Sequence, residues 1–289
     1  MATVIKVINQ LLKRMNILIY GSRGWIGTQF ISLLKEHTID FVIGNARDNY
    51  EDEIQSSGCS HVFACIGRTH GGNFTTIDYL EQPGKLKENI NDNLYSPIII
   101  ANACRDMNIH FTYIGTGCIF KSDDTMPVMG FSEESSPNFY GSSYSTVKGF
   151  TDQILKNYTT ILNLRIRLPI TSQNNPRNLI TKITSYDKIC SVPNSVTVLP
   201  VMLPYIIEMM KMNIVGTYNM TNPGVISHNE ILSMYKDIVD PEFTWENFSE
   251  EEMVSKRSNT RLDTSKLEKM FPDIPGVVEA VRGCIKEMK

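Results

Sequence analysis

The sequence predicts an α/β fold built on a doubly wound parallel sheet, with a smaller C-terminal lobe. Short apolar segments alternate with helix-like segments through the first half of the chain, and a run of glycines directly follows the first apolar segment. Apolar strands separated by helices form a parallel sheet that is covered on both faces. Right-handed crossovers make such a sheet doubly wound.

The predicted elements follow one another along the chain. The apolar segments predicted to be strands are residues 16–20, 41–44, 61–67, 109–115 and 161–169. Helices are predicted at residues 25–36, 86–107 and 144–157. After Pro169 a polar loop leads to a predicted helix at 179–189 and to a short strand or hairpin at 191–200, and residues 216–224 are predicted to return to the main sheet as a strand.

The composition argues against several classes of partner. The 289 residues carry a formal net charge of −3, with a sequence pI of about 6.0, which favours neither nucleic acid nor an acidic membrane as a partner. The six cysteines are scattered without the spacing of a zinc site, so we expect no metal, and reduced thiols in the cytoplasm. No apolar run is long enough to span a membrane.

A glycine-rich turn follows the first predicted strand. Gly21, Gly24 and Gly27 have the spacing G-x-x-G-x-x-G between that strand and the next helix. Glycines permit a tight turn and let backbone N–H groups approach a pyrophosphate at the positive end of the helix. We therefore expect a dinucleotide cofactor at this turn, in contact with Trp25 and Ile26 as well.

The end of the second strand bears on which dinucleotide binds. An acidic residue there would bond the ribose hydroxyls of NAD, but the chain has Asn45 and Arg47 in this region, and Arg23 lies inside the glycine turn. The fork of donors on an arginine matches the oxygens of a 2′-phosphate. The pattern favours NADPH, and NADH stays open because both arginines could instead be solvated surface groups. Cys65, Gly67 and Pro169, near the ends of predicted strands, complete the expected cofactor site.

These elements predict two lobes. Residues 1–169 form the dinucleotide-binding domain, to which residues 216–240 return. Residues 170–215 and 241–289 form the smaller lobe, which we expect over the carboxyl ends of the strands, where folds of this class bind ligands.

Tyr144 and Lys148 lie four residues apart at the start of a predicted helix, so both side chains share one face. An ammonium near a phenol lowers the phenol's pKa, and we expect Lys148 to act on Tyr144 in this way. The phenol could then protonate a carbonyl oxygen while a hydride reaches the carbon.

Thr116, at the end of an earlier strand, completes a set with Tyr144 and Lys148. With the glycine turn, this set resembles the short-chain dehydrogenase/reductase family. The resemblance to the extended branch of that family implies a Rossmann-type domain, an added sugar-nucleotide lobe and a homodimer formed through a helix bundle. It also implies that Thr116 helps to hold the carbonyl oxygen.

A closer resemblance extends over nearly the whole chain. It is to the family of bifunctional 3,5-epimerase/4-reductases of nucleotide-rhamnose synthesis, which is related to dTDP-4-dehydrorhamnose reductase. The resemblance implies a UDP- or dTDP-bound 4-keto-6-deoxy-D-glucose as substrate. The loop IGRTHGGNF departs from the family's pattern. The stretches that carry the resemblance include ILIYGSRGWIG, TGCIF, SPNFYGSSYSTVK, LRIRLPI, NPRNLITKIT, VPNSVTVLP, GTYNMTNPGVISHNEIL and RSNTRLD.

Epimerisation at C3 and C5 needs one group that removes a proton and another that returns one on the opposite face of the ring. Cys118 is two residues after Thr116, so both point the same way if the strand geometry persists. By resemblance, Lys182 is the opposing group. The resemblance also favours substrate contacts at Asn93, Asn138, Arg257 and Asn259. Arg177, at a helix start, is interpreted as a cap.

Two alternatives remain open beside an NADPH-dependent epimerase/reductase. The chain could reduce the C4 ketone only, with a separate epimerase elsewhere. It could also bind a dinucleotide as a regulatory subunit without turnover, although the intact Thr/Tyr/Lys set argues against this.

Overall fold

The computed structural model describes residues 15–122, 128–249 and 258–288. At its centre lies a six-stranded sheet with the order β2-β1-β3-β4-β5-β7, in which every neighbouring pair is parallel. The chain passes from β1 to β2 on one side and then crosses to β3 on the other, so the order of the sheet reverses between β1 and β3. Ligands of doubly wound folds bind outside the carboxyl ends of the strands at this point. The strands are β1 (Asn16–Tyr20), β2 (Asp40–Ile43), β3 (His61–Ala64), β4 (His110–Thr116), β5 (Ile161–Ile166) and β7 (Gly216–Asn219).

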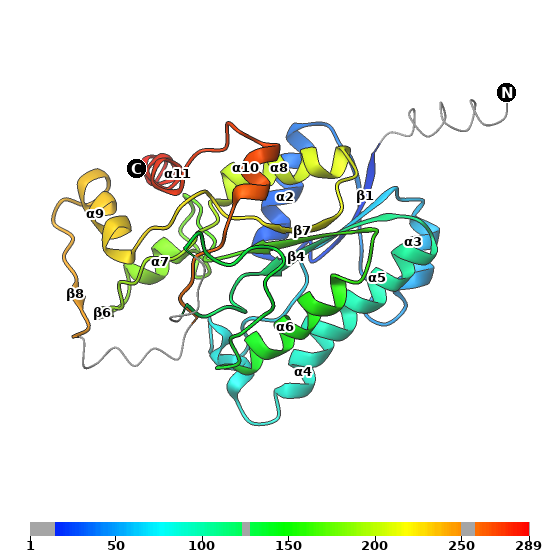
Figure 1. Cartoon of the computed structure of the whole chain (residues 1–289), viewed down its shortest axis with the longest axis horizontal. Coiled ribbons are helices and arrows are strands. Elements are labelled where there is room, and N and C mark those ends of the chain that lie inside the picture. The colour runs from blue at the N-terminus through cyan, green and yellow to red at the C-terminus, as the bar shows by residue number, and fades with distance from the viewer. Residues whose placement is uncertain (1–14, 123–127, 250–257, 289) are drawn as a thin grey trace.

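The predicted strands of the sheet are confirmed. Their side chains alternate between two buried faces, as β1 illustrates: Ile17 and Ile19 join one apolar cluster, and Leu18 and Tyr20 join another. Figure 1 shows helices on both sides of the sheet. One cluster holds α2 (Trp25–Glu36) and α8 (Leu199–Lys211), and the other holds α3 (Tyr50–Ser57), α5 (Ser96–Asp106) and the end of α6 (Ser143–Leu155).

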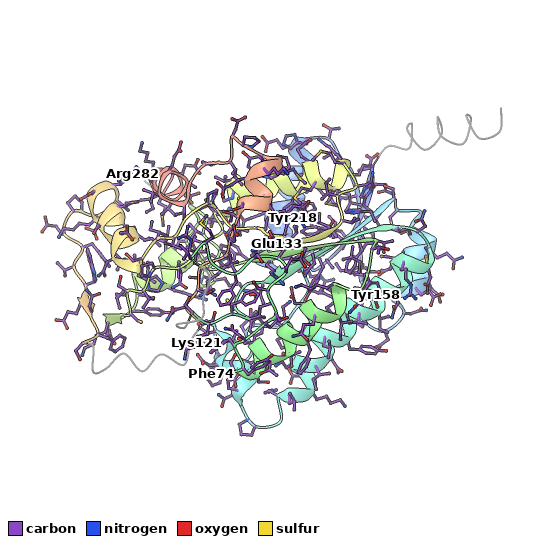
Figure 2. The ribbon with its side chains drawn as sticks, viewed as in Figure 1. Phe74, Lys121, Glu133, Tyr158, Tyr218 and Arg282 are labelled. Carbon is purple, nitrogen blue, oxygen red and sulfur yellow. The ribbon has the colours of Figure 1, made fainter. Side chains whose placement is uncertain are left out.

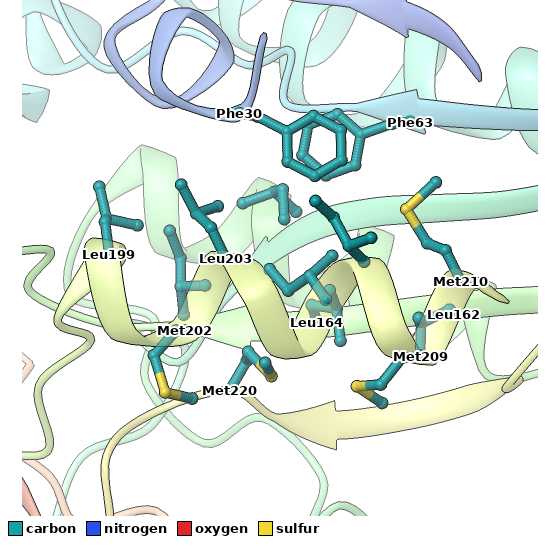
Figure 3. Close-up of a cluster of buried hydrophobic side chains, with 14 of the residues drawn as sticks. Phe30, Phe63, Leu162, Leu164, Leu199, Met202, Leu203, Met209, Met210 and Met220 are labelled. Carbon is teal, nitrogen blue, oxygen red and sulfur yellow. The ribbon is translucent and has the colours of Figure 1, made fainter. Parts of the chain in front are cut away.

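Helix α8 packs against one face of the sheet (Figure 3). Leu203 and Met210 belong to the same cluster as Phe30 and Phe63, whose rings stack with centroids 3.8 Å apart. The sequence pattern does not predict this helix, because Pro204 lies inside it and proline usually disfavours a helix interior. Residues 170–215, assigned to the smaller lobe, therefore include a helix that packs against the sheet.

A third apolar cluster forms beside the carboxyl ends of the strands. It joins α7 (Leu179–Ile183), α9 (His228–Ile238) and α11 (Val277–Lys286). Two short strands, β6 (Lys188–Ile189) and β8 (Glu246–Asn247), pair at its edge. Strand β7 lies in the main sheet as expected, whereas α9, within the same predicted returning segment, packs in this cluster. The exact division into two lobes stays a proposal. Helix α10 (Ser265–Met270) packs with the sheet through Leu267.

Three local predictions are refined by the structure. The helix predicted at 86–107 is α4 (Leu86–Ile90), a π-helical turn η2 (Asn91–Tyr95) and α5 in succession, and a short 3₁₀ helix η1 (Ile77–Glu81) precedes it. The helix predicted at 179–189 ends at Ile183. The strand or hairpin predicted at 191–200 is wrong, because Asn194 and Val198 make only single bridges to Ile226 and Ile170. Within the described ranges, none of the helices has the length and apolar character needed to cross a membrane.

Candidate active site

A cavity of about 510 Å³ opens at the carboxyl ends of the strands. Its wall includes Gly24 after β1, Gly67 after β3, Thr116 at the end of β4 and Leu168 after β5. Helix α7, which belongs to the third apolar cluster, supplies another part of the wall through residues such as Lys182. The cavity therefore lies where a doubly wound sheet binds its ligand.

The glycine turn has a shape that larger residues could not adopt. Gly21 has φ +91°, a conformation that favours glycine, and a Cβ on Gly27 would lie 2.2 Å from the carbonyl oxygen of Gly21. Gly24 is the N-cap of α2, and no side chain caps the helix there. The N–H groups at the start of α2 are thus free of side-chain caps and face the turn. This arrangement fits the diphosphate of a dinucleotide.

The expected cofactor residues divide into two groups. Residues that line the cavity are Gly24, Trp25, Ile26, Cys65, Gly67, Tyr144, Lys148 and Pro169. The others lie outside this lining: Gly21 and Gly27 in the glycine turn, and the exposed residues Arg23, Asn45 and Arg47. The N–H groups of Asn45 and Ala46 donate to the carboxylate of Glu53, which fixes the loop after β2.

Tyr144 and Thr116 meet at the cavity wall. Thr116 is the last residue of β4, and Tyr144 lies in the first turn of α6, which Ser142 caps by accepting a hydrogen bond from the N–H of Ser145. Burial raises the pKa of Tyr144, and the neighbouring Cys118 raises it further, while a hydrogen bond with Thr116 opposes the rise. The phenol is therefore held in its protonated form.

Lys148 is buried beside this pair and donates a hydrogen bond to the hydroxyl of Tyr113. Burial lowers the pKa of Lys148 to about 7, against the opposing effect of Asp152 and Cys118. The sequence-based expectation that Lys148 lowers the pKa of Tyr144 is wrong for this structure. The reason is that desolvation dominates the phenol and the ammonium is directed to Tyr113.

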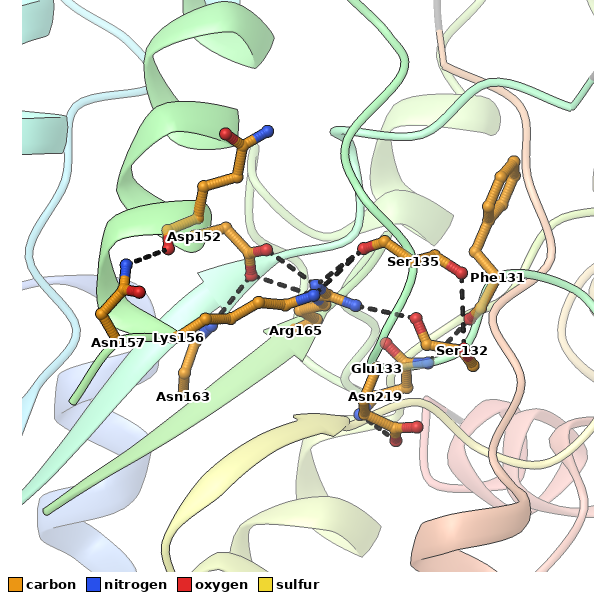
Figure 4. A network of polar contacts seen from close by, with 11 residues as sticks. Phe131, Ser132, Glu133, Ser135, Asp152, Lys156, Asn157, Asn163, Arg165 and Asn219 are labelled. Carbon is orange, nitrogen blue, oxygen red and sulfur yellow. Dashed lines mark hydrogen bonds and ion pairs between the residues drawn. The ribbon is translucent and has the colours of Figure 1, made fainter. Parts of the chain in front are cut away.

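A buried polar network fixes α6 against the sheet (Figure 4). The guanidinium of Arg165, on β5, donates to both carboxylate oxygens of Asp152, on α6, and to the carbonyl oxygen of Ser132. Asn163 also donates to Asp152. Because Asp152 lies one turn after Lys148, this network sets the position of the helix that carries the lysine and the tyrosine.

Cys118 lines the cavity together with Thr116. The strand geometry does not persist to Cys118, because β4 ends at Thr116 and Cys118 lies in the following turn. The turn is held by the N–H of Cys118, which donates to Oγ1 of Thr116 at 3.1 Å. The sulfur accepts a hydrogen bond from Nη1 of Arg167 at 3.4 Å. The thiol of Cys118 and the hydroxyl of Thr116 therefore reach the same cavity because the chain turns after β4. The alternation of side chains along a strand is not the cause.

Lys182 lies on α7, a helix of the third apolar cluster, and lines the cavity. Arg177 lines it too and hydrogen-bonds His70, a residue of the loop that departs from the family's pattern. The interpretation of Arg177 as a helix cap is wrong, because the side chain of Asn178 caps α7 instead.

Some of the expected substrate residues line the cavity and others do not. Asn93 and Asn259 line the cavity, and Asn93 also holds the backbone of Arg68 through its amide. Asn138 is exposed and lies outside the lining, where its amide bonds the backbone of Lys121, a residue labelled in Figure 2. Arg257 lies outside the described residues.

Arg167 and Asn194 line the cavity but have no role in the sequence-based prediction. A signal for Arg167 exists in the stretch LRIRLPI, where two arginines alternate with apolar residues and so share one face of a buried strand. Across residues 15–122, 128–249 and 258–288, no group of three or more His, Cys, Asp or Glu side chains could hold a metal ion.

The family described as the RmlD substrate binding domain matches residues 15–289. The chain belongs to this family.

Two relatives are similar in sequence to this family member over most of its length. L780 of Acanthamoeba polyphaga mimivirus is 47% identical over 283 residues, covering 94% of this chain and 98% of L780. A crystal structure of L780, described as a UDP-rhamnose synthase, has a TM-score of 0.91 and covers 95% of this chain and 100% of that chain. A bifunctional dTDP-4-dehydrorhamnose 3,5-epimerase/reductase of Arabidopsis thaliana is 42% identical over 278 residues, covering 92% of this chain and 91% of that protein.

More distant structures share the fold. The dTDP-4-dehydrorhamnose reductase of Bacillus anthracis, solved in complex with NADP, has a TM-score of 0.78 at 17% identity and covers 95% of this chain and 99% of that chain. The Rossmann-type α/β fold expected from the sequence is therefore confirmed.

Proposed function

We propose that this RmlD family member epimerises C3 and C5 of a UDP- or dTDP-bound 4-keto-6-deoxy-D-glucose and then reduces C4, giving the nucleotide-L-rhamnose. One observation carries the proposal: Thr116, Tyr144, Lys148, Cys118 and Lys182 all line the cavity that the glycine turn borders. The identities with L780 and with the Arabidopsis bifunctional enzyme support it.

The reduction step uses the residues around Tyr144. When bound, the nicotinamide supplies the hydride. Thr116 and Tyr144 hold the C4 ketone oxygen, and Tyr144, which is kept protonated by burial, donates the proton. Lys148 orients the cofactor ribose through its amine, and its position in the cavity wall next to Tyr113 supports this role.

Epimerisation uses two groups from different elements. The C4 ketone makes the hydrogens on C3 and C5 acidic, and an enolate forms when one of them is removed. Cys118 removes the proton from one face and Lys182, on α7, returns a proton to the other. The two side chains come from separate elements that both line the cavity, and the reaction requires them to reach opposite faces of the ring.

One incubation tests this function. The protein, NADPH and each 4-keto-6-deoxyglucose nucleotide react in heavy water, and the product is analysed for identity and label position. We expect nucleotide-L-rhamnose with deuterium at C3 and C5. Cys118→Ala should keep NADPH binding and lose the label at C3 or C5. Full exchange in that variant removes the thiol from the mechanism, and an unepimerised product from the wild type leaves only the reductase.

NADPH is proposed over NADH. Arg23 and Arg47 are exposed beyond the ends of β1 and β2, where a 2′-phosphate of a bound dinucleotide would lie, and their charge suits a phosphate. We expect a lower KM for NADPH than for NADH, and Arg47→Ala should reduce the difference. A clear preference of the wild type for NADH overturns the assignment.

A homodimer in the cytoplasm is proposed as the working form. Side chains exposed on α4, η2 and α6 include Leu86, Ile90, Tyr95, Phe150 and Ile154, an apolar surface suited to a helix bundle. No disulfide joins the six cysteines, all of which lie in the described ranges, and this suits a reducing compartment. Light scattering should give twice the chain mass of 32.8 kDa, and Phe150→Glu should give the monomer. A monomeric wild type contradicts the dimer.

A further inference from the structure

Arg167 is a buried cation that lines the cavity. Only 1% of the residue is exposed. Its Nη1 donates to the hydroxyl of Ser258 at 2.9 Å and to the sulfur of Cys118 at 3.4 Å. Its Nη2 donates to Oδ1 of Asn194 at 2.6 Å and to the carbonyl oxygen of Ser258, while its Nε has no hydrogen-bond partner in the part of the chain that the structure describes.

Arg165 and Arg167 differ in whether a carboxylate pairs with the guanidinium. Both guanidiniums are buried and lie two residues apart in the LRIRLPI stretch. Arg165 forms an ion pair with Asp152 at 2.7 Å, whereas within the described part of the chain Arg167 has no carboxylate partner. A buried charge without a counter-charge is costly. Among the described residues that accept a hydrogen bond from Arg167, the thiol of Cys118 is the one group that can become an anion.

We propose that Arg167 holds Cys118 as a thiolate and thereby makes its sulfur the base of epimerisation. This inference rests on the proposed function, in which Cys118 removes a ring proton. Arg167 is a positioning residue, since it acts on the substrate through the sulfur. A thiolate accepts a proton, whereas a neutral thiol cannot, so the charge of Arg167 decides which of the two faces the substrate.

The first step then balances in atoms and charge. The C–H bond next to the ketone breaks, an S–H bond forms on Cys118, and the electron pair of the C–H bond passes into the enolate. The negative charge moves from sulfur to the C4 oxygen. The ammonium of Lys182 next gives a proton to the opposite face of the same carbon and becomes a neutral amine. A proton lost to water by the thiol and one gained from water by the amine restore the starting state.

Other titratable groups share the surroundings of the sulfur. Tyr144 and Lys148 from α6 interact with Cys118. Arg167, which directly follows β5, interacts with it too. Lys182 on α7 and His228 on α9 line the same cavity. Arg167 is the cation among these whose hydrogen bond to the sulfur is seen in the described residues.

The test is the pH profile of alkylation at Cys118. Native protein reacts with iodoacetamide from pH 5 to pH 10, and the peptide that contains Cys118 is quantified by mass spectrometry. An ordinary thiol, which titrates near ~8.5, is only a few per cent thiolate at pH 7. We expect the wild type to react at pH 7 within about twofold of its high-pH plateau, since a guanidinium favours the thiolate. A wild-type profile like that of an ordinary thiol overturns the inference without any variant.

Substitutions of Arg167 distinguish the effect of its charge on the alkylation of Cys118 from the effect of its packing. Arg167→Gln should lose at least about tenfold in rate at pH 7 and keep the high-pH plateau, because the thiol still forms its anion in base. Arg167→Lys should recover part of the rate at pH 7. Arg177→Gln removes a second cavity guanidinium that does not contact the sulfur, and its profile should match the wild type. An Arg167→Gln profile that superimposes on the wild type contradicts the inference.

Two combined results separate this inference from the function on which it rests. Fast alkylation at pH 7, together with a Cys118→Ala variant that still exchanges deuterium, contradicts the proposed function and keeps the thiolate. An ordinary alkylation profile, together with a Cys118→Ala variant that loses exchange, keeps the function and contradicts the thiolate.

Discussion

Asp152 and Arg165 form a bidentate ion pair in which Nε and Nη2 of the guanidinium lie 2.9 and 2.7 Å from the two carboxylate oxygens. The pair joins α6 to β5 inside the protein, where both side chains are buried. Since α6 carries Tyr144 and Lys148, the pair couples the stability of the fold to the geometry of the site.

Arg165→Met should destabilise the protein by about 3–5 kcal/mol, because it leaves the carboxylate of Asp152 buried without its cation. Urea unfolding of the cofactor-free protein measures the change. The double variant Arg165→Met/Asp152→Leu removes both charges and should be less destabilised than the single variant. If the double variant is the less stable of the two, the cost of an unpaired charge does not explain the effect.

Gly27→Ala should weaken NADPH binding at least about tenfold, because its Cβ would lie 2.2 Å from the carbonyl oxygen of Gly21 and force the turn open. Calorimetric titration with NADPH measures the loss. Gly283→Ala, in α11, is the matched control, since nothing lies within 4 Å of its Cβ and alanine favours a helix by up to ~1 kcal/mol. Equal NADPH affinity in both variants would show that the turn does not hold the cofactor.

Tyr144→Phe should lower kcat for C4 reduction by about 10²–10⁴-fold, because the buried phenol is the proton donor. NADPH affinity should persist, since it does not need the hydroxyl. Deuterium exchange at C3 and C5 should continue at a lower rate, because Thr116 still holds the C4 oxygen that carries the enolate charge. Single-turnover oxidation of NADPH and mass spectrometry of the recovered ketosugar give the two readouts. A reduction rate that the substitution leaves intact assigns the proton donor elsewhere.

The histidine pair His61 and His110 should make the protein sensitive to acid. The two rings lie 5.1 Å apart on β3 and β4, and each bonds a backbone carbonyl oxygen, of Met210 and Ile214 respectively. Burial and the neighbouring His110 lower the pKa of His61 to about 4, so the folded form holds it neutral while the unfolded chain binds a proton below about 6.5. The free energy of unfolding should therefore fall as the pH drops from about 6.5 towards 4.

Urea titrations between pH 7.5 and pH 4.5 measure this dependence. His61→Gln removes one titrating ring and keeps a donor for the carbonyl oxygen of Met210, so its stability should fall less steeply with acid than that of the wild type. Identical slopes for the two proteins would exclude His61 as a source of the acid sensitivity.

The sequence predicted those features that depend on local pattern. Strand β1 is a short apolar run ending at Gly21, so both its bounds and the turn after it could be read directly. Tyr144 and Lys148 share a helix face for the same local reason. Helix α8 was not predicted, because Pro204 lies inside it and proline disfavours a helix interior. Packing against the sheet stabilises the helix despite this proline.

Features that depend on distant contacts could not be predicted in this way. The partner of Arg167, Ser258, lies 91 positions further along the chain, and no periodicity relates them. Lys148 is directed to Tyr113 because two elements pack together, which the spacing of Tyr144 and Lys148 does not reveal. The alternation of side chains along a strand could place Arg165 and Arg167 on one buried face. It could not show which of the two would pair with a carboxylate.

The wall of the cavity is drawn from almost the full length of the chain, from Gly24 to Asn259. A backbone break between α6 and β5 would put the phenol and the thiol on one fragment and Arg167 and Lys182 on the other. Neither fragment alone would contain the reaction centre. Recovery of turnover after mixing such halves would report directly on reassembly of the molecule.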